Sequence, residues 1–558
     1  MNHFQKRVIL ILILLSIPAG LLFLQLVRLQ VIERQSLNQK RIQQSQQIIA
    51  IPGRKGNIFD RNGTLLVTNI DSYALYAVPP RVENAAGTAA FLSRIIQTDE
   101  LKLKEKLTSP TQFVWLARQL TKTQKDLIKD KKITGLYFIE NTRRIYLKNK
   151  LAGQVLGFTG IDNQGLSGIE FAYDKILSGK DGFLVIEQDA TGREMYYANR
   201  ILKEPINGQD IKLTLDETLQ YFSEKYLKKA IDRHQANSGC ILIQDVQTGE
   251  ILAMASYPFL NPNIFLNTPE MNRKNLAIQK VYEPGSTLKL ATVGTALDLG
   301  MVNPDTKYQN EETLKVGEHT IHEAERIKDP NSQKTIAEII IESINVGSAK
   351  LGQRIGKENL FKNFKKFGFS VRTGIALPGE EAGLFNDPQK WKDVEQATIP
   401  FGQGIGITPI QLISYVSAIG NDGYWQTPKI ISKINDNDPK IKYTRKKILE
   451  SKTAWQLRTM MQDVVRKGSG VAAAIPGYSI GGKTGTAQKI NPSTGRYDTQ
   501  NYISSFVGLA PLKRPKIAIL VVIDSPQRDY YGGVVAAPVF KDIAQTALRV
   551  LNVGPDEL

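Results

Sequence analysis

The stretch Glu283-Pro-Gly-Ser-Thr-Leu-Lys289 opens a predicted helix that ends at Gly300, and it places two reactive side chains at the start of that helix. Ser286 and Lys289 have an i,i+3 spacing, so they lie on one helix face about one turn apart. A serine hydroxyl is a poor nucleophile until a neighbour takes its proton, and a buried lysine near other cations has a lowered pKa and can take it. A serine and a lysine with this spacing are more often simply exposed on a helix. Whether they form a catalytic pair therefore depends on partner residues elsewhere in the chain.

Two further motifs follow. Ser343-Ile-Asn345 lies on a predicted helical stretch and places a hydroxyl and an amide beside the apolar residues 339–341. Lys483-Thr-Gly-Thr486 begins a group of predicted strands. Gly485 allows a ligand backbone to lie close to the strand edge, and the lysine and hydroxyls are donors for a carboxylate. Each motif alone is also consistent with a polar helix face or a glycine-rich turn, and their order together is what indicates a site.

The hydrophobic pattern around these motifs predicts an α+β fold. Residues 275–470 are mainly helical, and a last helix covers 537–551. Strands are predicted over residues 240–245, 251–257, 502–510 and 517–523. Two strands, a helical insert and returning strands predict an antiparallel sheet with an all-helical half. The earlier part of the chain is mixed, with residues 85–132 expected to be helical and 135–147 expected to form a strand.

Composition excludes several classes of protein. The chain has 558 residues, 42% hydrophobic and 23% charged, so it is long enough for more than one domain and is not wholly disordered. Its single cysteine, Cys240, cannot form an intrachain disulfide. His319-Thr-Ile-His322-Glu323 lies in a predicted strand-to-loop region, so we expect no metal there and no cofactor. The net charge of +18 favours anionic surroundings but does not choose among nucleic acid, phospholipid and an acidic polymer.

Residues 8–27 form an uncharged apolar run near the N-terminus. A helix of that length spans roughly 30 Å, the hydrocarbon core of a bilayer. The run exceeds the apolar core of a signal peptide and no A-x-A cleavage site follows, so we expect a retained transmembrane helix. The flanking lysines and arginines do not fix the side of the membrane on which the rest of the chain lies.

The three motifs, in this order, resemble the S-x-x-K, S-x-N and K-T-G set of penicillin-binding proteins and serine β-lactamases. Residues 55–63 resemble the RGxIxDRNG segment of class B penicillin-binding proteins, with Lys55 in place of the first arginine, and 157–170, 248–258 and 401–409 resemble other segments of that family. Over nearly its whole length the chain is therefore similar to these membrane-anchored peptidoglycan D,D-transpeptidases. The Gly-Phe-Thr segment at 157–159, the length and the lack of C-terminal repeat modules favour the division, or septal, type.

The resemblance implies a catalytic role for five residues. Ser286 attacks the D-Ala-D-Ala carbonyl of a peptidoglycan stem peptide and forms an acyl-enzyme, with Lys289 as the neutral general base. Ser343 relays a proton to the leaving amine. Asn345 orients Lys289 and the substrate amide, and Lys483 supports the site electrostatically.

It also implies a binding site for stem peptides and for β-lactams. Thr484 and Thr486, with Gly485 between them, bind the terminal carboxylate. The backbone N–H groups of Ser286 and Thr486 form an oxyanion hole, in which each donor is typically worth about 3 kcal/mol. No cofactor and no nucleic acid takes part.

The resemblance divides the chain into four parts. These are a short cytoplasmic tail (1–7), a transmembrane anchor (8–27), an elongated mixed pedestal domain (28–205) and a transpeptidase domain with a serine β-lactamase-like fold (206–558). Because crosslinking takes place outside the cytoplasmic (inner) membrane, residues 28–558 are expected on its periplasmic or extracytoplasmic side. The anchor and pedestal are expected to bind a SEDS-type glycosyltransferase and divisome proteins.

Two alternatives stay open. In a β-lactamase or a D,D-carboxypeptidase, water replaces the acceptor amine. No second-carboxylate motif is evident at 380–386, and lactamases without one usually have S-x-V where this chain has Ser343-Ile-Asn345. A divisome scaffold or a β-lactam sensor with a vestigial site is disfavoured by the intact motifs, and residues 1–7 leave no room for a cytoplasmic signalling module.

Overall fold

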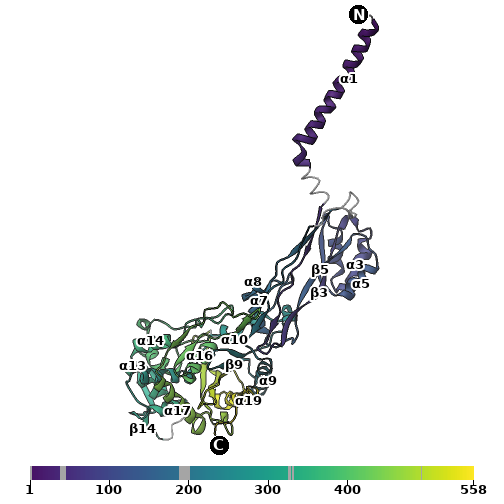
Figure 1. The fold of residues 1–558 in the computed structure, drawn as a ribbon. Helices are drawn as coiled ribbons and strands as arrows, with labels where there is room; N and C mark the ends of the chain where they lie inside the picture. Colours follow the sequence, from purple (N-terminus) through teal and green to yellow (C-terminus); the bar gives the residue numbers. More distant parts are fainter. Residues whose placement is uncertain are drawn as a thin grey trace. The chain divides into compact units, whose positions relative to one another are not determined.

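The computed structural model describes residues 3–37, 46–187, 201–324, 329, 332–491 and 493–557. The chain separates into two compact units, Met1–Arg54 with Ser178–Gly208, and Lys55–Leu177 with Gln209–Leu558 (Figure 1). The first unit contains the helix α1 (His3–Val27), a π-helical turn η1 (Arg28–Ile32) and a three-stranded antiparallel sheet. The strands of this sheet are β1 (Gln46–Ile51), β6 (Gly182–Glu187) and β7 (Ile201–Lys203).

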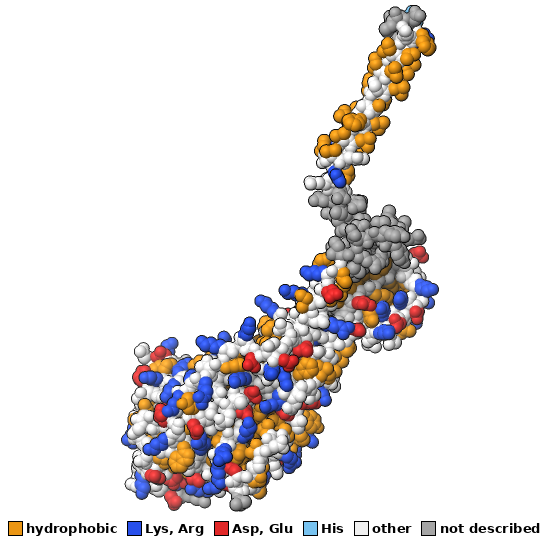
Figure 2. Space-filling view, viewed as in Figure 1, with side chains coloured by type: hydrophobic (Ala, Val, Ile, Leu, Met, Phe, Trp, Pro, Cys, Tyr) orange, Lys and Arg blue, Asp and Glu red, His pale blue; other side chains and the backbone are white. Residues whose placement is uncertain are grey.

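The helix α1 includes the whole apolar run at 8–27, so a helix at this position is confirmed. Its apolar side chains are exposed, and Figure 2 shows hydrophobic side chains along its length. By length and composition, residues His3–Ile32 are sufficient to cross a membrane. Pro18 lies inside the helix, where a membrane-spanning segment tolerates it.

The second unit begins with a six-stranded sheet in the order β16-β8-β2-β3-β4, with β5 also paired to β3. The strands are β2 (Ile58–Phe59), β3 (Leu65–Ala77), β4 (Val114–Leu120), β5 (Leu136–Tyr146), β8 (Ile211–Leu213) and β16 (Ile431–Ile434). Three helices pack on it and bury Leu92, Leu103 and Ile128 against Leu75 and Leu116 of the sheet. These helices are α3 (Ala85–Ile96), α4 (Glu100–Leu107) and α5 (Lys122–Asp130).

The prediction that residues 85–132 are helical was wrong for β4. This segment pairs with β3 and buries Leu116 and Leu120. Val114 and Trp115 are residues that favour a pleated, half-buried strand. Pairing with β3 therefore outweighs the local helical pattern of the sequence. The strand predicted at 135–147 is confirmed as β5.

A five-stranded antiparallel sheet forms the centre of the C-terminal part, in the order β10-β9-β20-β19-β18. Its strands are β9 (Ser238–Asp245), β10 (Ile251–Tyr257), β18 (Gly481–Ile490), β19 (Tyr497–Ala510) and β20 (Ile517–Asp524). One face packs on α9 (Glu217–His234) and α19 (Ala537–Val550), and the other packs on the helical segment between β10 and β18. The predicted sheet, formed by strands on both sides of a helical insert, is confirmed.

The helical half places the first two motifs at helix starts. Its main helices are α11 (Lys289–Asp298), α12 (Ile336–Ile341), α13 (Asn345–Ile355), α14 (Lys357–Phe367), α16 (Pro409–Gly420) and α17 (Ser451–Lys467). Lys289 opens α11 and Asn345 opens α13. The helical stretch predicted around Ser343 is interrupted, because this residue lies between α12 and α13 with a φ of 63°.

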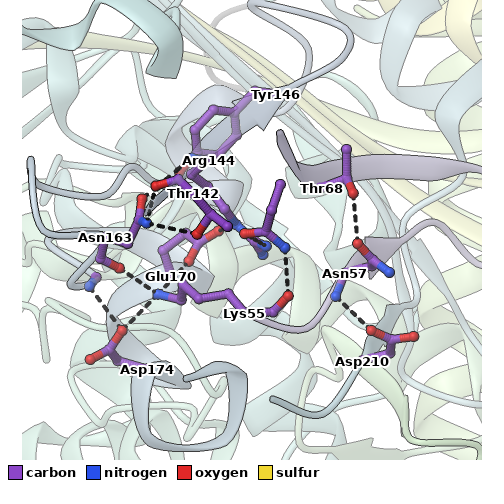
Figure 3. A network of polar contacts seen from close by, with 12 residues as sticks. Lys55, Asn57, Thr68, Thr142, Arg144, Tyr146, Asn163, Glu170, Asp174 and Asp210 are labelled. Carbon is purple, nitrogen blue, oxygen red and sulfur yellow. Dashed lines mark hydrogen bonds and ion pairs between the residues drawn. The ribbon is translucent and has the colours of Figure 1, made fainter. Parts of the chain in front are cut away.

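Two segments that the sequence had singled out meet in a buried ion-pair network (Figure 3). Lys55 Nζ lies 3.0 Å from Glu170 Oε2 and 2.7 Å from Asp174 Oδ1. Arg144 Nε donates to Glu170 Oε1 at 2.6 Å. Glu170 is fully buried, and Lys55 and Arg144 are only 6% and 4% exposed. The network joins segment 55–63 to segment 157–170, and the lysine found in place of the family's arginine still pairs with two carboxylates.

Close backbone packing explains two glycines of segment 157–170. Gly157 has a φ of 78°, and a Cβ there would lie 1.8 Å from the Ser167 carbonyl oxygen. Gly168 has a φ of 56°, and its Cβ would lie 2.4 Å from the Val155 carbonyl oxygen. Only glycine fits such positions without moving the backbone.

Candidate active site

Ser286 lies in a single 3₁₀ turn, η5 (Gly285–Leu288), directly before α11. The preceding Gly285 has a φ of 56°, a conformation that favours glycine. Ser286 is partly exposed, whereas Lys289 is fully buried. Within the described part of the chain the Ser286 hydroxyl takes part in no hydrogen bond, so it is open to a substrate. Contacts of catalytic groups are often long before substrate binds.

The Lys289 ammonium group is held by the second motif. Its Nζ donates to Asn345 Oδ1 at 2.8 Å, to the Ser343 carbonyl oxygen, and to Ser343 Oγ at 3.4 Å. Burial lowers the pKa of Lys289 to about 7, while the charge of the nearby Glu323 acts in the opposite direction. A lysine in this environment is neutral in a large fraction of molecules at neutral pH, as a general base requires.

Lys483 on β18 reaches the same hydroxyl. Its Nζ donates to Ser343 Oγ at 2.9 Å and to the Thr484 carbonyl oxygen at 3.2 Å. The side chain is fully buried. Burial and the charge of Lys289 hold the pKa of Lys483 well below its ordinary value. The Ser343 hydroxyl therefore lies between two buried lysines. The backbone of Ser343 is in the left-handed region. Such strained conformations are concentrated at functional sites.

The third motif lies on β18, at the edge of the five-stranded sheet. Thr484 is 6% exposed, and its Oγ1 lies 2.7 Å from Ser469 Oγ. Thr486 Oγ1 accepts a hydrogen bond from the Gly532 N–H at 3.0 Å. At Gly485 a Cβ would lie 2.4 Å from Ser505 Oγ and 3.0 Å from the Pro284 carbonyl oxygen. This glycine therefore lets β18 pack against the segment that precedes Ser286, which the sequence reasoning had not anticipated.

The structure thus brings the three motifs together through direct contacts among Lys289, Ser343, Asn345 and Lys483. The edge strand β18 approaches the turn that contains Ser286. A buried lysine with a lowered pKa, a hydroxyl shared by two lysines and an edge strand form a constellation suited to acyl transfer.

Several residues near this site were missed by the sequence reasoning. Glu283 Oε1 accepts hydrogen bonds from the Gly404 N–H at 2.8 Å and the Tyr497 hydroxyl at 3.3 Å, and burial raises the pKa of Glu283. Tyr502, on β19, stacks with Tyr530 at a ring-centroid distance of 4.3 Å. None of these had a motif spacing that would identify it.

Glu323 was also missed as a site residue, although its segment had been considered for metal binding. Its two carboxylate oxygens accept hydrogen bonds from the first backbone N–H groups of α13. His319 and His322 lie on the exposed hairpin strand β13 (His319–His322). In the described ranges, no group of three or more His, Cys, Asp or Glu side chains could hold a metal ion.

Glu380 bears on the β-lactamase alternative, because such an enzyme needs a carboxylate to activate the deacylating water. Glu380 Oε1 accepts hydrogen bonds from Thr373 N–H and Oγ1, each at 2.6 Å, and Oε2 accepts from Gly374 N–H at 3.1 Å. Both oxygens are therefore engaged by the residue's own loop.

Comparison with known families and proteins gives a consistent assignment. The penicillin-binding protein transpeptidase domain matches residues 239–545, and the penicillin-binding protein dimerisation domain matches residues 50–213. The chain is 34% identical to peptidoglycan D,D-transpeptidase FtsI of Escherichia coli K12 over 545 residues, which cover 95% of this chain and 89% of that one. It is 35% identical to stage V sporulation protein D of Bacillus subtilis over 518 residues, covering 90% of this chain and 79% of that one.

Solved structures agree with this assignment. A peptidoglycan synthetase from Bifidobacterium adolescentis superposes with a TM-score of 0.74 at 26% identity, covering 92% of this chain and 98% of the other. Penicillin-binding protein 3 from Mycobacterium tuberculosis, complexed with aztreonam, gives a TM-score of 0.70 at 27% identity, covering 91% and 98%. The chain therefore belongs to the class B penicillin-binding proteins, the serine-type peptidoglycan D,D-transpeptidases that β-lactams target.

Proposed function

We propose that this chain crosslinks peptidoglycan stem peptides during septal cell-wall synthesis, through an acyl-enzyme on Ser286. The observation that supports this most strongly is a pair of fully buried lysines, Lys289 and Lys483, which both donate a hydrogen bond to the Ser343 hydroxyl. Lys289 lies one helical turn after Ser286, whose side chain is partly exposed. Burying two cations without a carboxylate in contact costs stability, so such a pair is retained for its chemistry.

The acylation step follows from these positions. Neutral Lys289 accepts the Ser286 proton as Oγ attacks the carbonyl of the penultimate D-alanine. The peptide C–N bond then breaks, and the leaving D-alanine amine receives a proton relayed through Ser343 from the lysine pair. Asn345 keeps Lys289 in place, and Lys483 holds the shared hydroxyl. An amine of a second stem peptide then attacks the ester, which forms the crosslink and restores Ser286.

Substrate binding is assigned to the β18 edge. Thr484, Gly485 and Thr486 would contact the terminal carboxylate of the stem peptide, with the peptide backbone lying along the edge strand. The oxyanion that forms on the attacked carbonyl would be stabilised by the backbone N–H groups of Ser286 and Thr486. A β-lactam would enter the same site and leave a stable acyl-serine.

The apolar helix at the N-terminus supports a membrane-anchored arrangement. In this proposal residues 1–7 are cytoplasmic, 8–27 are the anchor, 28–205 the pedestal, and 206–558 the transpeptidase domain outside the inner membrane. A SEDS-type glycosyltransferase and divisome proteins are proposed as partners of the anchor and pedestal. Replacing residues 8–27 with an unrelated membrane span should abolish complementation, and full complementation would contradict this partner assignment.

Intact-mass spectrometry of the full-length protein in detergent with benzylpenicillin tests the function. One persistent adduct per chain, absent from Ser286→Ala, is the expected result. Rapid loss of the adduct with turnover of the drug would indicate a β-lactamase. An absence of adduct on folded protein would favour the scaffold or sensor alternative. With stem pentapeptide, a crosslinked dimer distinguishes a transpeptidase from a carboxypeptidase, which releases only D-alanine and tetrapeptide.

A further inference from the structure

We infer that Glu323 is a positioning residue of this active site. It fixes the start of α13, and through Asn345 it places and tunes the Lys289 amine. The inference rests on the proposed function, because it concerns the group that accepts the Ser286 proton. It assigns a role to the segment 319–323, which no part of the acylation step above uses.

The first observation is the way Glu323 caps α13. Its Oε2 accepts a hydrogen bond from the Asn345 N–H at 2.6 Å, and its Oε1 accepts one from the Val346 N–H at 2.7 Å. The residue at the N-cap position of α13 is Ile344, whose side chain cannot accept a hydrogen bond. The first N–H groups of a helix have no partner within it, and a negative charge is favourable there. Glu323 therefore supplies, from another element, the cap that the α13 sequence lacks.

The second observation is that the neighbouring backbone orients the Asn345 side chain. Asn345 Nδ2 donates to the His322 carbonyl oxygen at 3.1 Å, which directs Oδ1 to Lys289 Nζ at 2.8 Å. The two adjacent residues 322 and 323 thus hold both the backbone and the amide of Asn345. They extend from the hairpin of β12 (Thr313–Val316) and β13.

The third observation is electrostatic. The Glu323 charge favours the ammonium form of Lys289, against burial, which lowers its pKa. On β18, burial and the charge of Lys289 lower the pKa of Lys483. Burial, and then the charges of Glu323, Glu338 and Glu342, raise the pKa of Tyr308 on β11 (Lys307–Gln309), so this phenol stays neutral.

The experiment compares acylation of three variants of the full-length protein in detergent by a fluorescent penicillin, from mildly acidic to mildly alkaline pH. Glu323→Gln removes the charge and one of the two acceptors. Glu323→Asp keeps the charge but shortens the side chain. Glu318→Gln is the matched control, because it makes the same charge change at an exposed position of the same hairpin. The final amount of acyl-enzyme gives the folded fraction of each variant.

For Glu323→Gln we expect the alkaline plateau of the acylation rate to fall about tenfold, since a hydrogen bond to a charged group is lost. We also expect the acid limb to move to lower pH, because Lys289 loses the charge that favours its protonated form. Glu323→Asp should keep the acid limb of the wild type but lower the plateau. Glu318→Gln should change neither.

A role in folding alone would lower the thermal unfolding midpoint of the Glu323 variants and leave the rate of the folded fraction and its acid limb unchanged. That result would overturn the inference. If Glu323→Gln does not fold, Glu323→Asp decides, because a plateau equal to that of the wild type would contradict positioning. If the wild type itself forms no Ser286 adduct, the proposed function fails. If the wild type reacts normally but the Glu323 variants match the Glu318→Gln control, only the inference about Glu323 fails.

Discussion

Two regions of this molecule bury pairs of cations, and they do so in opposite ways. In the N-terminal part of the second unit, Lys55 and Arg144 contact the fully buried Glu170 directly. In the active site, Lys289 and Lys483 are fully buried and contact a hydroxyl, an amide and carbonyl oxygens instead. Among the ion pairs of the described residues, none includes Lys289 or Lys483.

The difference separates structure from chemistry. A buried cation that touches a carboxylate keeps its charge and holds segments together, whereas one that is solvated only by neutral groups loses its proton more readily. The first arrangement suits a junction between the segments 55–63 and 157–170. The second suits the base and the proton relay that we propose. Comparable substitutions in the two regions test this contrast.

The largest effect is expected for Lys289→Arg. An arginine cannot become neutral at functional pH, so it cannot accept the Ser286 proton. The rate constant for acylation by penicillin should fall about 10³-fold, in the range attributed to a general base. The measurement is the time course of adduct formation by intact mass. A variant that acylates within about tenfold of the wild type would show that Lys289 is not the base.

A smaller effect, on stability and not on chemistry, is expected for Glu170→Gln. It leaves Lys55 and Arg144 buried with one anion fewer, and breaking a buried ion pair in this way costs about 3 kcal/mol. The thermal unfolding midpoint should fall, while the acylation rate of the folded fraction stays that of the wild type. Glu140→Gln, on an exposed position of β5, is the control and should change neither. A slower acylation rate with an unchanged midpoint would reverse the assignment.

The smallest effect is expected for Lys55→Arg, which is the same type of substitution as Lys289→Arg. An arginine keeps the charge that Glu170 and Asp174 pair with, so the stability should change by less than about 1 kcal/mol and acylation should be unchanged. Thermal unfolding and the acylation rate are measured side by side with Lys289→Arg. A loss of stability as large as that of Glu170→Gln would mean that the compact ammonium group, and not the pairing of charge, is required there.

Much of this arrangement could be predicted from the sequence because it depends on local patterns. The motif order, the short apolar strands 240–245 and 517–523, and the apolar run 8–27 led to the correct sheet and the correct N-terminal helix. The strand β4 was assigned to a helix, because its pairing with β3 is a tertiary contact that the local pattern does not contain.

Other features of the site could not be predicted, for a different reason. The left-handed conformation of Ser343 comes from the junction of two helices, and its sequence resembles a continuous helix. Glu323, which caps α13, lies 22 positions before Asn345 in the chain, and Ser469, which contacts Thr484, lies just after α17. Residues that contact the motifs from distant segments have no fixed sequence spacing to them. The motif residues could therefore be predicted from the sequence, whereas the residues that orient them could not.

The most direct test of the central claim is the pH dependence of Ser286 acylation in the wild-type protein. If Lys289 must be neutral, the rate constant should be low at acidic pH and rise with increasing pH through a midpoint near its lowered pKa of about 7. A rate constant that does not change across this range, or that rises only where an ordinary lysine loses its proton, would contradict the claim that burial prepares this lysine as the base.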